Sequence, residues 1–176
     1  MNILVVYSTR TGNTRKVGQA IFDALPEHKT FLSVEEAEGE SFFYDLVFAG
    51  FWAYRKSADQ ASRHFLSRMQ CANAALYATA GAYPDSEHAR LCLIHGAALL
   101  PSGTHLWGSF ICQGRVDPAS AARTAARYPM GHPHSMTPER RKRLEDASSH
   151  PDEADLERAR QFALAVVAGM KQMGER

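Results

Sequence analysis

The sequence has few cysteines, no long apolar run and almost no net charge. Its three cysteines, Cys71, Cys92 and Cys112, lie far apart in apolar stretches without a C-x-x-C pair, so neither a disulfide framework nor a zinc site is expected. No uncharged apolar stretch of about 18 residues occurs, and we expect no membrane span. The net charge of +1 disfavours nucleic acid as a partner.

The rest of the composition is typical of one globular domain. At 176 residues, with 45% hydrophobic and 22% charged side chains, the chain is long enough for a single core. The segment Met1–Thr14 contains an apolar run, but no basic residue precedes the run and no cleavage site follows it. We therefore expect a single domain over residues 1–176 and a cytoplasmic location.

Five apolar segments have the pattern of buried parallel strands. Residues Asn2–Tyr7 form an apolar, β-branched run, which is typical of a strand covered on both faces. The others lie at 31–34, 46–50, 74–79 and 105–112. Apolar residues at helical spacing separate most of these segments, and such alternation favours right-handed crossovers in a parallel sheet. We predict a doubly wound α/β fold, a three-layer α/β/α sandwich.

The last third of the chain departs from this alternation. Between residues 117 and 152, X-Pro steps interrupt the pattern, and Thr137-Pro138-Glu139 has the form of a helix start. We expect two short helices on a surface excursion at about 115–151. A final helix at about 152–173 carries one apolar stripe, and Asp152 is placed as its N-cap residue.

The loop after the first strand has the composition of a phosphate-binding turn. Ser8–Thr14 reads S-T-R-T-G-N-T, and a turn between a strand and a helix aims backbone N–H groups at one point. The G-x-x-x-x-G-K-[ST] loop is absent because Asn13 stands where its lysine should be, and G-x-G-x-x-G is absent too. A nucleoside triphosphate or NAD is thereby disfavoured. A loop that merely caps the helix is the alternative, because Ser and Thr favour such positions.

Aromatic residues follow two further strands at the same predicted edge of the sheet. In open α/β sheets a ligand lies beyond the carboxyl ends of the strands, where the strand order reverses. The segment 51–56 (F-W-A-Y-R-K) and the segment 80–84 (A-G-A-Y-P) should therefore form loops that meet the phosphate loop. Exposed rings on both sides of that pocket predict a flat aromatic ligand between them.

Together these segments resemble the flavodoxin family over nearly the whole chain. The residues T-R-T-G-N-T are similar to the family's FMN phosphate loop, and the two aromatic loops fall where the family holds the isoalloxazine ring. More narrowly, the segments 50–52, 81–89, 110–114, 132–140 and 150–156 resemble a bacterial subgroup of flavodoxin-domain proteins. Some members of that subgroup are associated with the bilirubin reductase system.

The resemblance implies a five-stranded parallel sheet of order 2-1-3-4-5 and FMN as the cofactor. Trp52 and Tyr83 would flank the flavin, and Arg55 would lie at the flavin edge, where common flavodoxins carry acidic side chains. The phosphate would be bound by Thr9, Arg10, Thr11, Gly12, Asn13 and Thr14, and further flavin contacts would come from Ala53, Tyr54, Ala80 and Gly81.

Three functions are compatible with these features. The first is an electron carrier that docks on a partner reductase, and a bilirubin reductase is a candidate partner. The second is an FMN-dependent oxidoreductase that acts directly on a tetrapyrrole or quinone, as flavodoxin-like protoporphyrinogen oxidases do, with residues 115–151 as a lid. The third is an interaction module without flavin, which the intact phosphate loop disfavours.

No catalytic residue and no metal ligand is assigned from the sequence. His132, His134 and His150 could form a metal site or a proton donor, but solvated loop residues are the simpler interpretation. The run Arg140–Arg143 forms an exposed helix face in the simpler interpretation. In the alternative, its positive charge attracts a carboxylate-bearing tetrapyrrole or an acidic partner.

Overall fold

Five parallel strands form the centre of the molecule. The computed structural model describes residues 1–26, 28–129, 131–132 and 135–174. The parallel strands are β1 (Ile3–Tyr7), β2 (Lys29–Ser33), β3 (Leu46–Tyr54), β5 (Asn73–Ala80) and β6 (His105–Gln113), and they lie in the order β2-β1-β3-β5-β6. A two-residue strand, β4 (Ser57–Ala58), pairs antiparallel with the end of β3. Without β4 the order is 2-1-3-4-5, which confirms the predicted topology.

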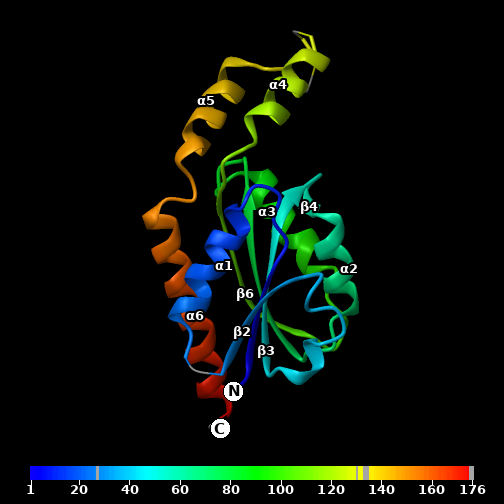
Figure 1. Ribbon diagram of the computed structural model, residues 1–176, viewed down its shortest axis with the longest axis vertical. Helices are drawn as coiled ribbons and strands as arrows, with labels where there is room; N and C mark the ends of the chain where they lie inside the picture. The colour runs from blue at the N-terminus through cyan, green and yellow to red at the C-terminus, as the bar shows by residue number, and fades with distance from the viewer. Residues whose placement is uncertain (27, 130, 133–134, 175–176) are drawn as a thin grey trace.

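Helices cover both faces of this sheet (Figure 1). Helices α1 (Asn13–Ala24) and α6 (Glu153–Gly174) lie on one face, and α2 (Gln60–Arg68) and α3 (Glu87–Ala97) lie on the other. The side chains of β1 alternate between the two cores: Ile3 packs on the α1 side and Leu4 on the α2 side. Both are fully buried, so the predicted three-layer sandwich is confirmed. A 3₁₀ turn, η1 (Ser41–Phe43), lies between β2 and β3.

Short polar side chains fix where the helices begin. The Asp59 carboxylate accepts the backbone N–H of Ser62 at the start of α2, and the Ser86 hydroxyl accepts that of Ala89 at the start of α3. Such caps satisfy N–H groups that the first helical turn leaves unpaired. None of the helices in the described ranges has the length and apolar character that crossing a membrane requires.

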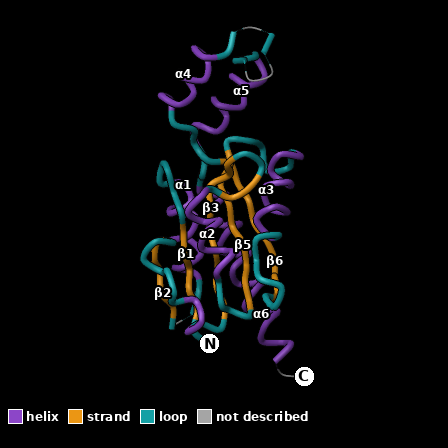
Figure 2. Tube along the Cα trace, turned by 90° about the vertical axis from the view of Figure 1, so that its right-hand side faces the viewer, coloured by secondary structure: helices purple, strands orange, loops and turns teal. Residues whose placement is uncertain are grey.

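A pair of helices projects beyond the carboxyl edge of the sheet (Figures 1 and 2). Helices α4 (Pro118–Arg127) and α5 (Pro138–Asp146) follow β6, and a 3₁₀ turn, η2 (Ala147–Ser149), leads back to α6. The Thr137 hydroxyl accepts the N–H of Arg140, so α5 starts at the predicted Thr-Pro step. Neither α4 nor α5 contains a buried residue, so this arm lies outside the two cores.

The prediction that residues 51–56 form a loop is wrong. Strand β3 continues to Tyr54, and a turn at Arg55-Lys56 leads into β4. Phe51 is therefore fully buried against the α2 and α3 side rather than exposed. The strand alternation explains this, because Ala49 and Phe51 point to the same face of the sheet.

Tyr77 fills the space that Gly18 and Gly50 leave open. Its hydroxyl donates a hydrogen bond of 2.8 Å to the Val6 carbonyl, and its ring lies against Gly50 on the neighbouring strand. A Cβ atom on Gly50 would lie 2.1 Å from Cζ of Tyr77. The Tyr77 side chain can cross β3 and reach the Val6 carbonyl on β1 only because Gly50 has no side chain.

We expect the substitution Gly50→Ala to destabilise the fold by about 1–3 kcal/mol, because it overpacks a closed core. Gly103→Ala is the matched control, since a Cβ atom there meets nothing within 4 Å. Urea unfolding followed by circular dichroism measures both. Equal midpoints for the two variants would show that Tyr77 can move aside.

Candidate functional site

The loop between β1 and α1 leaves the amino end of α1 open. Gly12 precedes the helix with φ = 87°, a left-handed conformation that glycine adopts without a steric penalty. No side chain of the described residues caps the helix at Gly12, and the first helical bond runs from Lys16 N–H to the Gly12 carbonyl. The loop is thus not explained as a helix cap. The N–H groups of the first turn are free to bind an anion.

The hydroxyl groups of this loop point to different partners. The Thr9 hydroxyl accepts the Gly12 N–H at 3.0 Å, and the Thr11 hydroxyl accepts the Asn13 side-chain amide at 3.0 Å. Thr14 is fully buried, and its hydroxyl lies 2.8 Å from that of Thr79 on β5. Thr11 is exposed, so its hydroxyl is the most accessible donor of the three.

A cavity of about 150 Å³ lies beside this loop. It brings together nine of the predicted residues: Thr9, Arg10, Thr11, Asn13, Thr14, Trp52, Ala53, Ala80 and Gly81. The predicted residues Gly12, Tyr54, Arg55 and Tyr83 do not line it. The sequence reasoning missed six further lining residues, namely Thr79, Gly114, Arg115, Val116, Asp117 and Ser120.

One signal could have located most of the missed residues. The segment after Gln113 leaves the sheet at the same edge as the predicted loops, because β6 is parallel to the other strands. The rule applied to β1, β3 and β5 therefore also applies to the turn that follows β6. Thr79 and Ser120 are the two exceptions, since they lie within β5 and α4.

Trp52 provides the aromatic wall of the cavity. Its ring is half-buried and lies 5.4 Å from the ring of Tyr54. The Arg10 guanidinium lies over the Trp52 ring at 5.7 Å, within the range of a cation–π contact. The phosphate loop and the end of β3 are thus in direct contact through Arg10 and Trp52.

The turn between β3 and β4 presents two cations. Arg55 and Lys56 have φ values of 50° and 61°, which fits a two-residue hairpin turn with left-handed central residues. Asn-Gly is the usual sequence for such turns, so the Arg-Lys pair gave no hairpin signal. The His95 Nδ1–H group donates to the Lys56 carbonyl at 2.7 Å, which anchors the turn to α3.

The turn after β6 closes over the cavity from the opposite side. The Asn13 side-chain amide donates to the Arg115 carbonyl at 2.8 Å. A Cβ atom on Gly81 would lie 2.4 Å from Cγ2 of Val116, so the two turns approach closely because Gly81 has no side chain. This close packing brings the ends of β1, β5 and β6 around one cavity.

Tyr83 is bound to the projecting arm rather than to the cavity. Its side chain is 37% exposed, and its hydroxyl donates to Oδ2 of Asp146 at 2.7 Å. This hydrogen bond raises the pKa of Tyr83 above its ordinary value. The same bond, together with Lys142, lowers the pKa of Asp146. The expected flavin-flanking tyrosine therefore positions α5.

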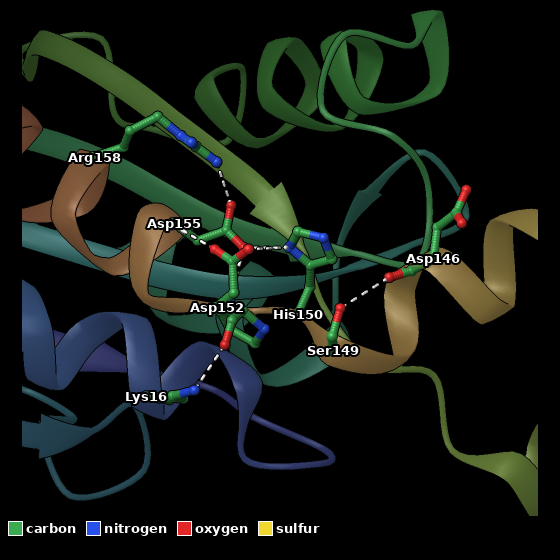
Figure 3. A network of polar contacts seen from close by, with 8 residues as sticks. Lys16, Asp146, Ser149, His150, Asp152, Asp155 and Arg158 are labelled. Carbon is green, nitrogen blue, oxygen red and sulfur yellow. Dashed lines mark hydrogen bonds and ion pairs between the residues drawn. The ribbon is translucent and has the colours of Figure 1, made fainter.

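A polar network at the base of the arm joins it to α1 and α6 (Figure 3). The Asp155 carboxylate accepts hydrogen bonds from the His150 ring and the Arg158 guanidinium. Asp152 and Asp155 each accept the backbone N–H of the other, which is a reciprocal cap at the start of α6. The Lys16 ammonium donates to the Pro151 carbonyl at 2.7 Å.

The histidines considered from the sequence are not brought together. The His132 ring stacks on Tyr128 with 4.4 Å between centroids, and His134 lies outside the described residues. His150, Asp152 and Asp155 are close enough to share a metal ion, but the Asp155 oxygens already accept hydrogen bonds from Arg158, His150 and a backbone N–H. We interpret this cluster as the helix cap described above.

Comparison with known proteins identifies the family. The model of the flavodoxin domain matches residues 4–164. The chain belongs to the flavodoxin domain family. A flavodoxin-like domain-containing protein named BilS, from Clostridioides difficile strain CD3, is 29% identical over 166 residues, covering 93% of this chain and 94% of that protein. The predicted resemblance is thereby confirmed.

Solved structures show the same fold. A short-chain flavodoxin associated with a non-canonical PDU bacterial microcompartment superimposes with a TM-score of 0.62 at 14% identity, covering 96% of this chain and 99% of that one. A flavoprotein from Lactobacillus acidophilus NCFM, solved in complex with FMN, gives a TM-score of 0.50 at 12% identity, covering 62% and 92%. At these identities the likeness concerns the fold alone.

The Tyr83–Asp146 hydrogen bond makes a testable prediction. The phenol of Tyr83 should titrate above the ordinary tyrosine pKa of about 10, because deprotonation would place its charge beside the Asp146 carboxylate. Asp146→Asn should bring this pKa back toward the ordinary value, and the neighbouring Glu145→Gln should not. NMR of ¹³Cζ-labelled tyrosine follows the titration. The bond should persist at neutral pH and be lost in acid, once pH falls through the lowered pKa of Asp146.

Proposed function

We propose that this protein binds FMN in the described cavity and transfers electrons to a partner reductase. The observation that carries the proposal is the uncapped start of α1, which opens beside Trp52 into one cavity. A helix N-terminus with free N–H groups binds a phosphate, and an aromatic wall binds a flat ring. The FMN cofactor expected from the sequence agrees with membership of the flavodoxin domain family.

The residues of the cavity fit the two ends of FMN. Thr9, Thr11 and Asn13, with the first N–H groups of α1, would hold the phosphate. Arg10 would add a positive charge, and Gly12 would permit the turn. Trp52 would contact the ring, together with the backbone of Ala53, Ala80 and Gly81. Bound FMN would supply reversible electron transfer, while these residues hold it and limit the access of water.

Arg10 is the side chain that must move in this proposal. Its guanidinium covers a face of Trp52 that a flavin ring would use. Because Arg10 is exposed, the movement requires no repacking of the core. We expect the guanidinium to leave Trp52 when FMN binds, which should change the fluorescence of that tryptophan.

The arm and its surroundings support a carrier over a stand-alone oxidoreductase. Helices α4 and α5 project away from the sheet in both views, and only the first part of α4 reaches the cavity, through Ser120 (Figures 1 and 2). A substrate lid would have to cover the cavity, and the two helices of the arm do not, because Ser120 is their only described lining residue. A bilirubin reductase is the first partner to test, because of the resemblance to the subgroup associated with that system.

Flavin titration tests the cofactor. Fluorescence quenching should show FMN binding, and Thr11→Val should weaken it about tenfold to a hundredfold, since a hydrogen bond to a charged group contributes about 1.5–3 kcal/mol. Riboflavin lacks the phosphate, so its affinity should be the same for both proteins. Thr30→Val on β2 is the matched control. Failure to bind FMN, or an equal loss for riboflavin, contradicts the assignment.

Turnover tests the role. With a chemical reductant as electron source, the FMN-loaded protein alone should not reduce bilirubin or a quinone at a catalytic rate. Addition of purified bilirubin reductase should start turnover. Steady turnover by the isolated protein would instead support the direct oxidoreductase. The measurement is the loss of substrate absorbance under anaerobic conditions.

A further inference from the structure

Basic side chains lie at the candidate flavin site, on the hairpin turn beside it and on helix α5 of the arm. We define the cationic rim as Arg10, Arg55, Lys56, Arg115, Arg141 and Arg143. Arg10 and Arg115 line the cavity, Arg55 and Lys56 form the hairpin turn, and the last two lie on α5. None of the six forms an ion pair with a carboxylate of the described residues. All but Arg143 are exposed.

The acidic side chains nearby only partly balance this charge. Asp117 is paired with Arg123 at 3.6 Å, and Asp146 with Lys142 at 3.0 Å. Four exposed carboxylates of the neighbouring segments, those of Asp85, Glu87, Glu139 and Glu145, have no ion pair with a described residue. Residues 115–151 contain seven Arg or Lys and four Asp or Glu residues. Since the whole chain carries only +1, its excess positive charge is concentrated at this edge.

One cation of the hairpin turn and one of helix α5 both affect the pKa of His88. His88, in the first turn of α3, has its pKa lowered first by partial burial and then by the charges of Lys56 and Arg143. A lowered pKa keeps this imidazole neutral at neutral pH. Lys56 and Arg143, more than 80 residues apart in the sequence, therefore both lie within electrostatic range of His88.

Two exposed aromatic rings lie within the same rim. Tyr54 is 42% exposed and Tyr83 is 37% exposed. The Arg55 guanidinium stacks on the Tyr54 ring at 5.3 Å, so the ring and the cation are exposed together. Tyrosine and arginine are enriched in the centres of protein interfaces, where they contribute most of the binding energy.

The arm is held in one orientation although it packs no side chain into the core. The segments that lead into and out of the arm are joined by the hydrogen bond from Arg115 N–H to the His150 carbonyl, at 2.9 Å. Asn13 and Lys16 bind the two ends of the arm from α1, and Tyr83 binds α5 from the β5 loop. These contacts fix the position of α5, and with it Arg141 and Arg143, relative to the carboxyl edge of the sheet.

We propose that the cationic rim is the docking surface for an acidic face of the redox partner protein. The proposal rests on the proposed function, because electron transfer requires the partner to approach the exposed edge of the flavin. A concentrated positive field would steer an acidic partner to that edge, and Tyr54 and Tyr83 would supply the close contacts.

An NMR titration with proteins of opposite charge tests this surface. The ¹⁵N-labelled full chain, with and without FMN, is titrated with an acidic plant-type ferredoxin and separately with basic cytochrome c. We expect ferredoxin to perturb amides of residues 54–56, 83, 85–88, 115–117 and 141–146 at about 10 mM salt. The perturbations should fade at about 0.3 M salt, because the Debye length falls from about 30 Å to below 10 Å. Cytochrome c should leave these amides unchanged.

Matched charge reversals complete the test. Lys56→Glu/Arg141→Glu should raise the ferredoxin dissociation constant at least about tenfold at low salt, and Lys56→Gln/Arg141→Gln should raise it less. The control variant Arg68→Glu/Lys171→Glu changes the net charge by the same amount at the ends of α2 and α6. It should leave the ferredoxin dissociation constant unchanged. The proposal is overturned if ferredoxin binds the Lys56→Glu/Arg141→Glu variant as tightly as the unaltered protein. It is overturned too if cytochrome c binds at the cationic rim. The FMN-free titration keeps this result separate from any failure to bind FMN.

Discussion

The hydrogen bond between the Asn13 side chain and the Arg115 carbonyl joins the first and last parts of the candidate site. Asn13 begins α1 directly after the phosphate-type loop, and Arg115 begins the turn that leads into the arm. The two residues are 102 positions apart, so the contact exists only when β1 and β6 have both joined the sheet. The amide also donates to Thr11, which links the same residue to the most exposed hydroxyl of the loop. The shape of the cavity thus depends on the completed fold rather than on any single loop.

The sequence allowed the sheet and the phosphate-type loop to be predicted because both depend on local patterns. The apolar, β-branched run before Ser8 has the pattern of a buried strand, and the alternation of strands and helices predicts a parallel sheet. The strand order itself was implied by the resemblance to the flavodoxin family. Thr137-Pro138 marked the start of α5 for an equally local reason, since a threonine cap and a proline in the first turn act within three residues.

The aromatic side of the site was harder to predict, because it depends on contacts between distant segments. Phe51 belongs to the core through the alternation of β3, but the length of that strand is set by β4, whose Arg-Lys turn carries none of the usual hairpin residues. Tyr83 was expected beside a flavin, yet its hydroxyl binds Asp146 on α5. No pattern within either segment indicates that pairing, since the two residues lie 63 positions apart.

The arm shows how a segment without a core can still have a defined place in the molecule. A helix pair with no buried residues gains little from the hydrophobic effect, so its position must come from directional contacts. Those contacts lie at its base, where backbone carbonyls of Arg115, His150 and Pro151 accept hydrogen bonds, and at Asp146, which Tyr83 binds. Exposed side chains of α5 such as Arg141 and Glu145 contribute to neither core. Positions of that kind can change their charge without affecting the packing of either core, so they are available for the recognition of one particular partner.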